Sequence, residues 1–181
     1  MRNRHFSVKD IALMAVFGCA SSLTTLTTAF IPAPLPGLYG IIAIPVSTIL
    51  TLTVIEIVGK FGAATFTQLV SGILSTLLPG GPPVAWIIIP GWCISGLLID
   101  SILYPTKKKP SESRLLTIIV GLVQNVPGDF LLYWSFVAFL GWDYSLFFFL
   151  YGFMIIHMVL GGLAGVFTPD VIRRIKPILS D

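Results

Sequence analysis

The lysines and arginines of this chain lie only in alternate gaps between six long apolar stretches. All eleven precede the first stretch, separate the second from the third or the fourth from the fifth, or follow the sixth. The connections at 31–37, 79–83 and 141–144 carry neither residue. Basic residues beside membrane-spanning helices stay on the cytoplasmic side. The pattern therefore predicts an all-α integral membrane protein with both termini in the cytoplasm.

The apolar stretches have lengths suited to crossing a bilayer, which takes about 20 residues each. We expect six transmembrane helices at about 10–30, 38–58, 62–78, 84–104, 115–140 and 145–167. Only 10% of the 181 residues are charged, against about 25% in a soluble domain. We therefore expect one transmembrane domain, 1–181, in a multi-pass protein of the plasma membrane. The basic start runs into an apolar stretch too long for a cleaved signal peptide.

Charge and cysteine content exclude several kinds of site. The net charge of +3 lies beside the predicted helices, where it favours the anionic lipids of the bilayer rather than nucleic acid. Cys19 and Cys93 are the only two cysteines, too few for a disulfide framework or a zinc site. The sequence also lacks a phosphate-binding G-x-x-x-x-G-K-[ST] loop. We expect no metal, no cofactor and no enzymatic activity.

Polar residues inside the fifth stretch mark a candidate ligand site. Asn125, Asp129 and Tyr133 recur every four residues, so they share one helix face, and Gln124 lies at its edge. Pro127 interrupts the backbone hydrogen bonds and predicts a kink. Kinked or broken helices are where many transporters bind their substrates.

Asp129 and His157 are predicted near the middle of the fifth and sixth helices. Adjacent antiparallel helices bring such residues together, and ionisable groups in a membrane need a partner or a water-filled cavity. Two interpretations stay open. The pair is either a structural hydrogen bond within the bundle or part of a ligand site.

Aromatic residues in the predicted outer half are candidates for stacking on a ligand. Trp92 and Trp134 would stack on a flat or cationic ring, and Tyr151 lies in the same half. The alternative is an interfacial belt of the kind common in membrane proteins.

Acidic residues near the predicted inner helix ends favour structural anchoring. Glu56 and Asp100 can each reach the cytoplasmic interface, and Lys60 follows Glu56 at a spacing that allows an ion pair.

Small residues recur along one side of the first predicted helix, at Ala12, Ala15, Cys19 and Ser22. Small side chains let helices approach closely in lipid. They serve either packing within the bundle or docking of another membrane protein.

Six crossings, proline-rich outer loops and this first helix together resemble the substrate-binding S component of an energy-coupling factor (ECF) vitamin transporter. The segment 60–72, Lys-Phe-Gly-Ala-Ala-Thr-Phe-Thr-Gln-Leu-Val-Ser-Gly, is similar to the start of helix 3 in the thiamine and hydroxymethylpyrimidine types. Gln68 stands where those proteins tend to have an acidic residue. Ala15 and Cys19 approximate the family's docking motif, with cysteine replacing the second alanine.

The resemblance implies a function and partners. An S component captures a vitamin or precursor from outside, in a pocket built mainly by helices 4–6 and the outer loops. A transmembrane T component and two cytoplasmic ATPase subunits then drive uptake.

Three other functions are compatible with the same residues. An autonomous secondary transporter or channel would relay protons through Asp129 and His157. An intramembrane serine protease would pair Ser71 with His157, although Leu69-Val70-Ser71-Gly72 lacks the glycine that precedes the nucleophile in rhomboid-like enzymes. A purely structural or assembly subunit is the third.

Overall fold

The computed structural model of the chain describes residues 5–30, 40–79, 81–143 and 145–179. Throughout these ranges the regular elements are helices and no strand occurs. The elements are α1 (Val8–Leu23), η1 (Thr24–Phe30), α2 (Ala43–Val58), α3 (Ala63–Ser75), η3 (Ala85–Ile87), α4 (Ile88–Thr106), η4 (Pro110–Glu112), α5 (Arg114–Val123), α6 (Val126–Leu140), α7 (Leu146–Phe149), the π-helical η5 (Leu150–Met154) and α8 (Ile155–Leu179). The expected outer loop at 31–37 lies outside the described residues.

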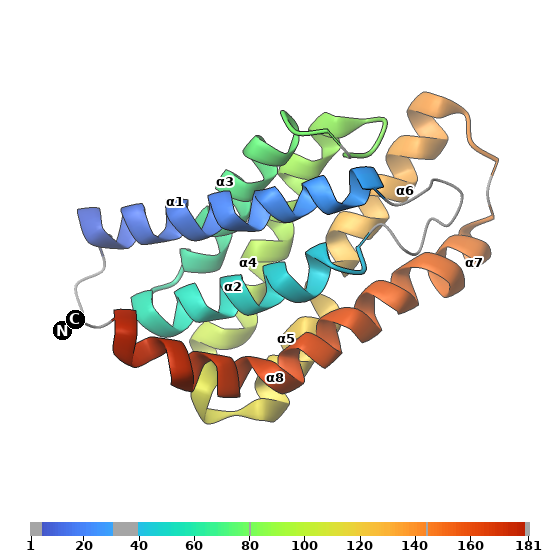
Figure 1. Ribbon diagram of the computed structural model, residues 1–181. Helices are drawn as coiled ribbons and strands as arrows, with labels where there is room; N and C mark the ends of the chain where they lie inside the picture. Colours follow the sequence, from blue (N-terminus) through green and yellow to red (C-terminus); the bar gives the residue numbers. More distant parts are fainter. Residues whose placement is uncertain (1–4, 31–39, 80, 144, 180–181) are drawn as a thin grey trace.

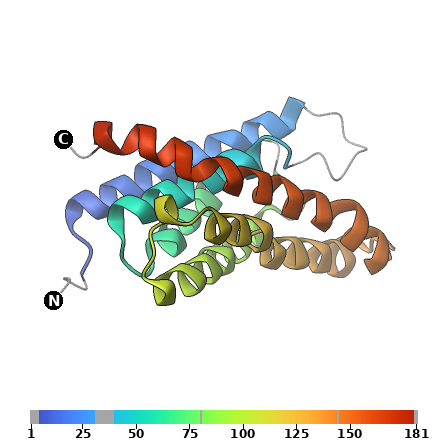
Figure 2. The same cartoon turned by 90° about the horizontal axis from the view of Figure 1, so that it is seen from below.

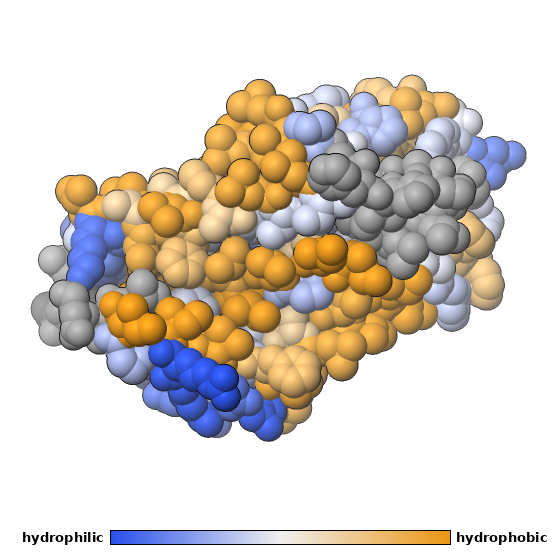
Figure 3. All heavy atoms as spheres, in the orientation of Figure 1, coloured by the Kyte–Doolittle hydropathy of each residue, from blue (hydrophilic) through white to orange (hydrophobic). Residues whose placement is uncertain are grey.

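Among the residues that the structure describes, four helical segments are long and apolar enough to cross a membrane: Val8–Thr28, Ala85–Thr106, Arg114–Leu140 and Leu146–Ile175. They fit a membrane-embedded protein, and apolar side chains cover much of the face seen in Figure 3. α2 and α3 are also apolar, but they have only 16 and 13 residues. At about 1.5 Å per residue they fall short of a hydrocarbon core about 30 Å thick. Six crossings and cytoplasmic termini therefore stay a prediction.

The helices form one bundle in which α2 is the central element (Figures 1 and 2). α1, α3 and α8 all pack against α2, and nine of its 16 residues are buried. Met14, Leu52, Ile99 and Val120 are each fully buried in the apolar core. The first and last described residues lie at the same end of the bundle (Figure 1). We call this the inner end, and the end with the α6–α7 connection the outer end.

Glycines allow α5 and α8 to pack backbone against backbone. A Cβ added at Gly161 would overlap the carbonyl oxygen of Gly121, and one at Gly165 would overlap that of Thr117. Pro169 has no N–H to give to the Gly165 carbonyl. Thr117 Oγ1 lies 2.7 Å from that oxygen and 2.8 Å from the Arg114 carbonyl oxygen, so its one proton is shared between the two acceptors. This packing fixes the rotation of α8 about its axis.

The predicted kink in the fifth stretch is confirmed as a break. α5 ends at Val123 and α6 begins at Val126, because Pro127 cannot donate to the Val123 carbonyl. Beyond the break α6 leaves α8 (Figure 1) and packs on α4. The close approach is between Gly91 and Gly128, where a Cβ on Gly91 would lie 3.2 Å from the Gly128 Cα.

The last helix extends beyond the predicted crossing, which ends at about 167. The helix continues through Pro169 to Leu179. A proline inside a helix leaves one carbonyl without its backbone donor, and here the Thr117 hydroxyl shares its proton with that carbonyl. The apolar pattern ended before the helix did because its last two turns are amphipathic and basic.

Carboxylates at the inner end are anchored, as expected, but with one different partner. Asp100 is 2% exposed and accepts from the backbone N–H groups of Ala64 and Thr65 at 3.2 and 2.9 Å. It thereby caps α3, whose own first residues offer no capping side chain. The predicted Glu56–Lys60 pair is replaced, because Lys60 Nζ binds Asp10 Oδ2 at 2.6 Å.

Candidate functional site

Asp129 and His157 form a buried pair between α6 and α8. His157 Nδ1 lies 2.9 Å from Asp129 Oδ1, and each residue is 6% exposed. The predicted proximity of the two residues is therefore correct. Their other polar atoms, Asp129 Oδ2 and His157 Nε2, are buried without a hydrogen-bond partner among the described residues.

Two amide side chains, those of Gln124 and Asn125, lie at the helix break, shortly before Asp129 in the sequence. Gln124 is 2% exposed, and its Nε2 donates to Thr48 Oγ1 on α2. Asn125 lies at the N-terminal boundary of α6, and its side-chain nitrogen packs close to Gly161 on α8. Gln124 Oε1 and Asn125 Nδ2 are buried without a partner in the described part of the chain.

Four buried polar atoms of the helix break and the neighbouring Asp129–His157 pair are thus left open in the described part of the chain. They are Gln124 Oε1, Asn125 Nδ2, Asp129 Oδ2 and His157 Nε2, and we call them the open polar cluster. Buried polar atoms are nearly always hydrogen-bonded in folded proteins, and each one left open costs about 1–3 kcal/mol. Such a concentration is typical of a site completed by water or by a ligand.

Gly40, just before α2, lies close to the open nitrogen of His157. A Cβ added there would lie 2.9 Å from His157 Nε2 and would overlap the Ile44 side chain. Glycine at position 40 therefore allows the backbone to pass close to the imidazole.

A column of aromatic rings leads from His157 toward the outer end. Phe153 lies 4.2 Å from the His157 ring, Phe149 lies 4.8 Å from Phe153, and Tyr133 lies 5.0 Å from Phe149, all between ring centroids. The π-helical turn Leu150–Met154 follows Phe149 and contains Phe153, so it lies within this column. Such turns often mark functional sites. Sequence reasoning identified Tyr133 but missed Phe149 and Phe153, which were hidden in a uniformly apolar run.

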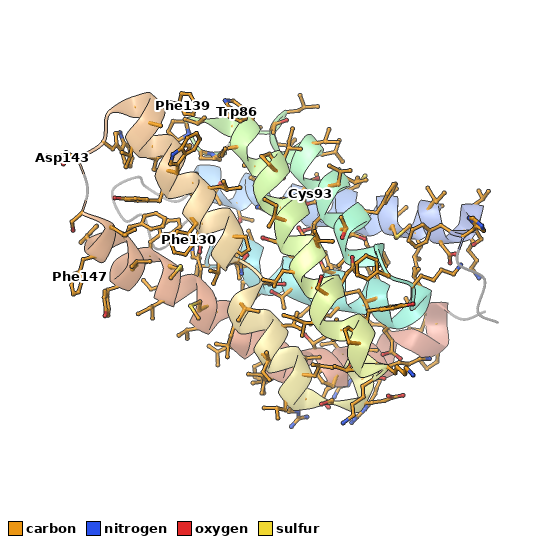
Figure 4. The ribbon with its side chains drawn as sticks, turned by 180° about the vertical axis from the view of Figure 1, so that it is seen from behind. Trp86, Cys93, Phe130, Phe139, Asp143 and Phe147 are labelled. Carbon is orange, nitrogen blue, oxygen red and sulfur yellow. The ribbon has the colours of Figure 1, made fainter. Side chains whose placement is uncertain are left out.

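The other predicted stacking residues lie away from the open polar cluster. Trp134 is 53% exposed and packs edge-on against Phe139, and Tyr151 is 59% exposed against Phe147. Figure 4 shows Phe139 beside Trp86 at the outer end, and Phe147 on the neighbouring α7. These exposed rings match the interfacial belt that the sequence left open as an alternative.

Trp92 is half-buried between α3 and α6. Its side chain approaches Gly72 on α3 and Gly128 on α6, with 3.7 and 3.8 Å to a Cβ built at each. It packs against α6 at Gly128, the residue directly before Asp129.

Gln68 binds α2 about one turn away from Thr48, the residue that Gln124 binds. It is 5% exposed, and its Nε2 donates to Thr51 Oγ1 at 3.0 Å, with Ser47 Oγ at 3.5 Å. The structure does not bring Gln68 into the open polar cluster.

The four small residues of α1 divide between two environments. Ala12 and Cys19 are exposed and Ala15 is partly exposed. Ser22 is buried, and its hydroxyl donates to the Cys19 carbonyl at 2.7 Å. Gly18, which faces α3, provides the close helix contact within the bundle. The side with Ala12 and Cys19 is left uncovered.

Neither a Ser71–His157 pair nor a metal-binding group is assembled among the described residues. Ser71 Oγ is buried with no hydrogen-bond partner in the described ranges, so it is not bonded to His157. No group of three histidine, cysteine, aspartate or glutamate side chains that would hold a metal ion occurs among the residues that the structure describes.

Comparison with known proteins gives no relative for this arrangement. No protein-family model matches the chain, and neither a curated protein nor a solved structure is significantly similar to it.

Proposed function

We propose that this chain is the substrate-binding S component of an ECF-type importer, which captures a water-soluble vitamin or precursor of the thiamine or hydroxymethylpyrimidine type from outside the cell. The open polar cluster carries this proposal. Two of the four unpaired polar atoms, on Gln124 and Asn125, lie where the chain breaks between α5 and α6, and the other two belong to the Asp129–His157 pair. A ligand that completes their hydrogen bonds offsets a desolvation cost already present in the empty protein.

The roles of the side chains follow from their chemistry. Asp129 meets a cationic or hydrogen-bond-donating group, and Gln124 and Asn125 bind the polar edge of a heterocycle. The rings of Phe153 and Tyr133 offer a flat apolar wall on the outer side. Binding pockets combine mostly apolar walls with a few polar groups that fix orientation.

Partner subunits supply the energy in this proposal. The sequence has no phosphate-binding loop, so ATP hydrolysis belongs to two ATPase subunits. The uncovered side of α1, at Ala12 and Cys19, suits docking of a transmembrane T component, since small side chains allow close helix approach.

Native mass spectrometry of gently extracted protein tests the proposal. The expected result is an adduct with the mass of a small vitamin or precursor, together with co-purification of a T component and ATPases from native membranes. Bare protein with no such partners contradicts it.

A secondary transporter is the second candidate, and the buried Asp129–His157 pair favours it. Purified chain alone in proteoliposomes distinguishes the two. Solute flux driven by a proton gradient without ATPases supports the secondary transporter and contradicts the S component.

A further inference from the structure

The hydroxyl of Thr48 determines which end of the Gln124 amide is left unpaired. Thr48 is fully buried in α2, and its Oγ1 donates to the Ile44 carbonyl at 2.7 Å. A hydroxyl carries one proton. With that proton used at Ile44, Thr48 offers only lone pairs to Gln124 and accepts the hydrogen bond from Nε2.

The opposite end of the amide is therefore an acceptor. Gln124 Oε1 is buried and open. If the amide were turned round, Oε1 would face Thr48 Oγ1 with no proton between the two oxygens. That arrangement loses one hydrogen bond and sets two acceptors against each other. The bond to Thr48 thus makes Gln124 Oε1, and not its NH₂ group, the buried end of the amide that has no partner in the described residues.

The Asp129–His157 pair leaves one oxygen and one nitrogen open beside the amides. The 2.9 Å contact joins Nδ1 to Oδ1, and which atom donates depends on the imidazole tautomer, so the polarity of Oδ2 and Nε2 is not fixed by the contact. Gln124 Oε1 is an acceptor and Asn125 Nδ2 a donor in every protonation state of that pair.

From this we infer that Thr48 is a positioning residue that, acting through Gln124, makes the site select ligands presenting an N–H donor. The inference rests on the proposed function, because it concerns the ligand of the same site. Thr48 on α2 thereby joins the residues that determine specificity, although its own hydroxyl is already bonded to Ile44 and Gln124.

A matched pair of probes tests the selection. The probes are hydroxymethylpyrimidine and its analogue with hydrogen in place of the exocyclic amino group, titrated calorimetrically into the purified full chain. We expect wild type to prefer the amino probe by about tenfold or more, the worth of one buried hydrogen bond. Thr48→Val keeps the shape and frees the amide to turn, so the preference should fall below about threefold. An unchanged preference overturns the inference.

Three further variants separate positioning from general stability. Thr48→Ser keeps the hydroxyl and should keep the preference. Thr53→Val, which loses a matching 2.7 Å bond to the Ile49 carbonyl on the same helix, should also keep it. In a Gln124→Leu background, adding Thr48→Val should change the preference no further. A further fall in that background shows that Thr48 acts by another route and overturns the inference.

A measurement without ligand keeps this result independent of the proposed function. In ¹⁵N-labelled protein, the side-chain NH₂ resonances that vanish in Gln124→Leu should move in Thr48→Val and return in Thr48→Ser. If neither probe binds wild type, the proposed ligand class fails, and these resonances alone decide the role of Thr48. Resonances that stay in place in Thr48→Val overturn that role.

Discussion

Asp129 and His157 face each other across α6 and α8 with 2.9 Å between Oδ1 and Nδ1, and each is 6% exposed. Only one nitrogen and one oxygen of the pair are used by the contact, and the other two atoms are open. A pair that served packing alone would gain by satisfying all of its polar atoms, since each open one costs free energy. The half-used pair is therefore the strongest indication of a ligand on its outer side.

Asp129→Asn should abolish most ligand affinity while the protein stays folded. The asparagine oxygen still accepts from His157, but an NH₂ group replaces the acceptor Oδ2. Losing a hydrogen bond to a charged group costs about 1.5–3 kcal/mol, or roughly 10–150-fold in Kd. Titration calorimetry with thiamine measures it, and Asp170→Asn at the exposed inner end serves as the control. Equal affinity in Asp129→Asn and wild type removes the role assigned to Asp129.

Gly161→Ala should destabilise the bundle because its Cβ would overlap the Gly121 carbonyl. Forcing α5 and α8 apart is expected to cost about 1–3 kcal/mol or more. Gly152→Ala is the matched control in the same long helix, since its Cβ would lie 3.9 Å from the nearest atoms, in the Phe148 ring. Thermal unfolding in detergent compares the two, and equal Tm values would show that the glycine contact is not tight.

Asp100→Ala should lower stability through the loss of the α3 cap. It removes the acceptor for the N–H groups of Ala64 and Thr65 and for the Thr65 hydroxyl. A lost cap costs about 0.5–2 kcal/mol, and unpaired buried donors add to this. Asp170→Ala, which breaks an exposed ion pair, should cost less than about 1 kcal/mol. The expected order of unfolding midpoints is wild type, then Asp170→Ala, then Asp100→Ala, and a reversed order contradicts the capping role.

The predicted topology can be read by cysteine labelling. In a background with Cys19 and Cys93 replaced by alanine, single cysteines go to the exposed positions Pro83, Asp143 and Lys108. Intact cells should react with a membrane-impermeant maleimide at the first two positions. Lys108→Cys should react only after the cells are opened, because basic connections stay inside. Labelling of all three positions in intact cells contradicts both the six crossings and the orientation.

Sequence reasoning predicted the elements of this site better than their orientation. Pro127 predicted the break, and the positions of Asp129 and His157 on consecutive helices predicted their meeting. Trp134 and Tyr151 lie away from the open polar cluster because helix rotation decides where a side chain points. That rotation is fixed by long-range contacts such as Gly121 with Gly161. In an all-apolar run, hydrophobic periodicity gives no signal for rotation.

The π-helical turn at Leu150–Met154 could not be predicted from the sequence either. A π-helical turn adds a residue to the helix without changing its composition. Nothing in the local sequence therefore distinguished Phe149 and Phe153, which stack above His157, from Phe147, which lies on the surface.

Titration of the purified wild-type chain with thiamine, hydroxymethylpyrimidine and a panel of other water-soluble vitamins tests the central claim most directly. An S component should bind at least one of them with saturable 1:1 stoichiometry, and the same compound should bind Asp129→Asn much more weakly. If none of the panel binds a folded, ligand-stripped sample, the protein is not the vitamin-capturing subunit proposed here.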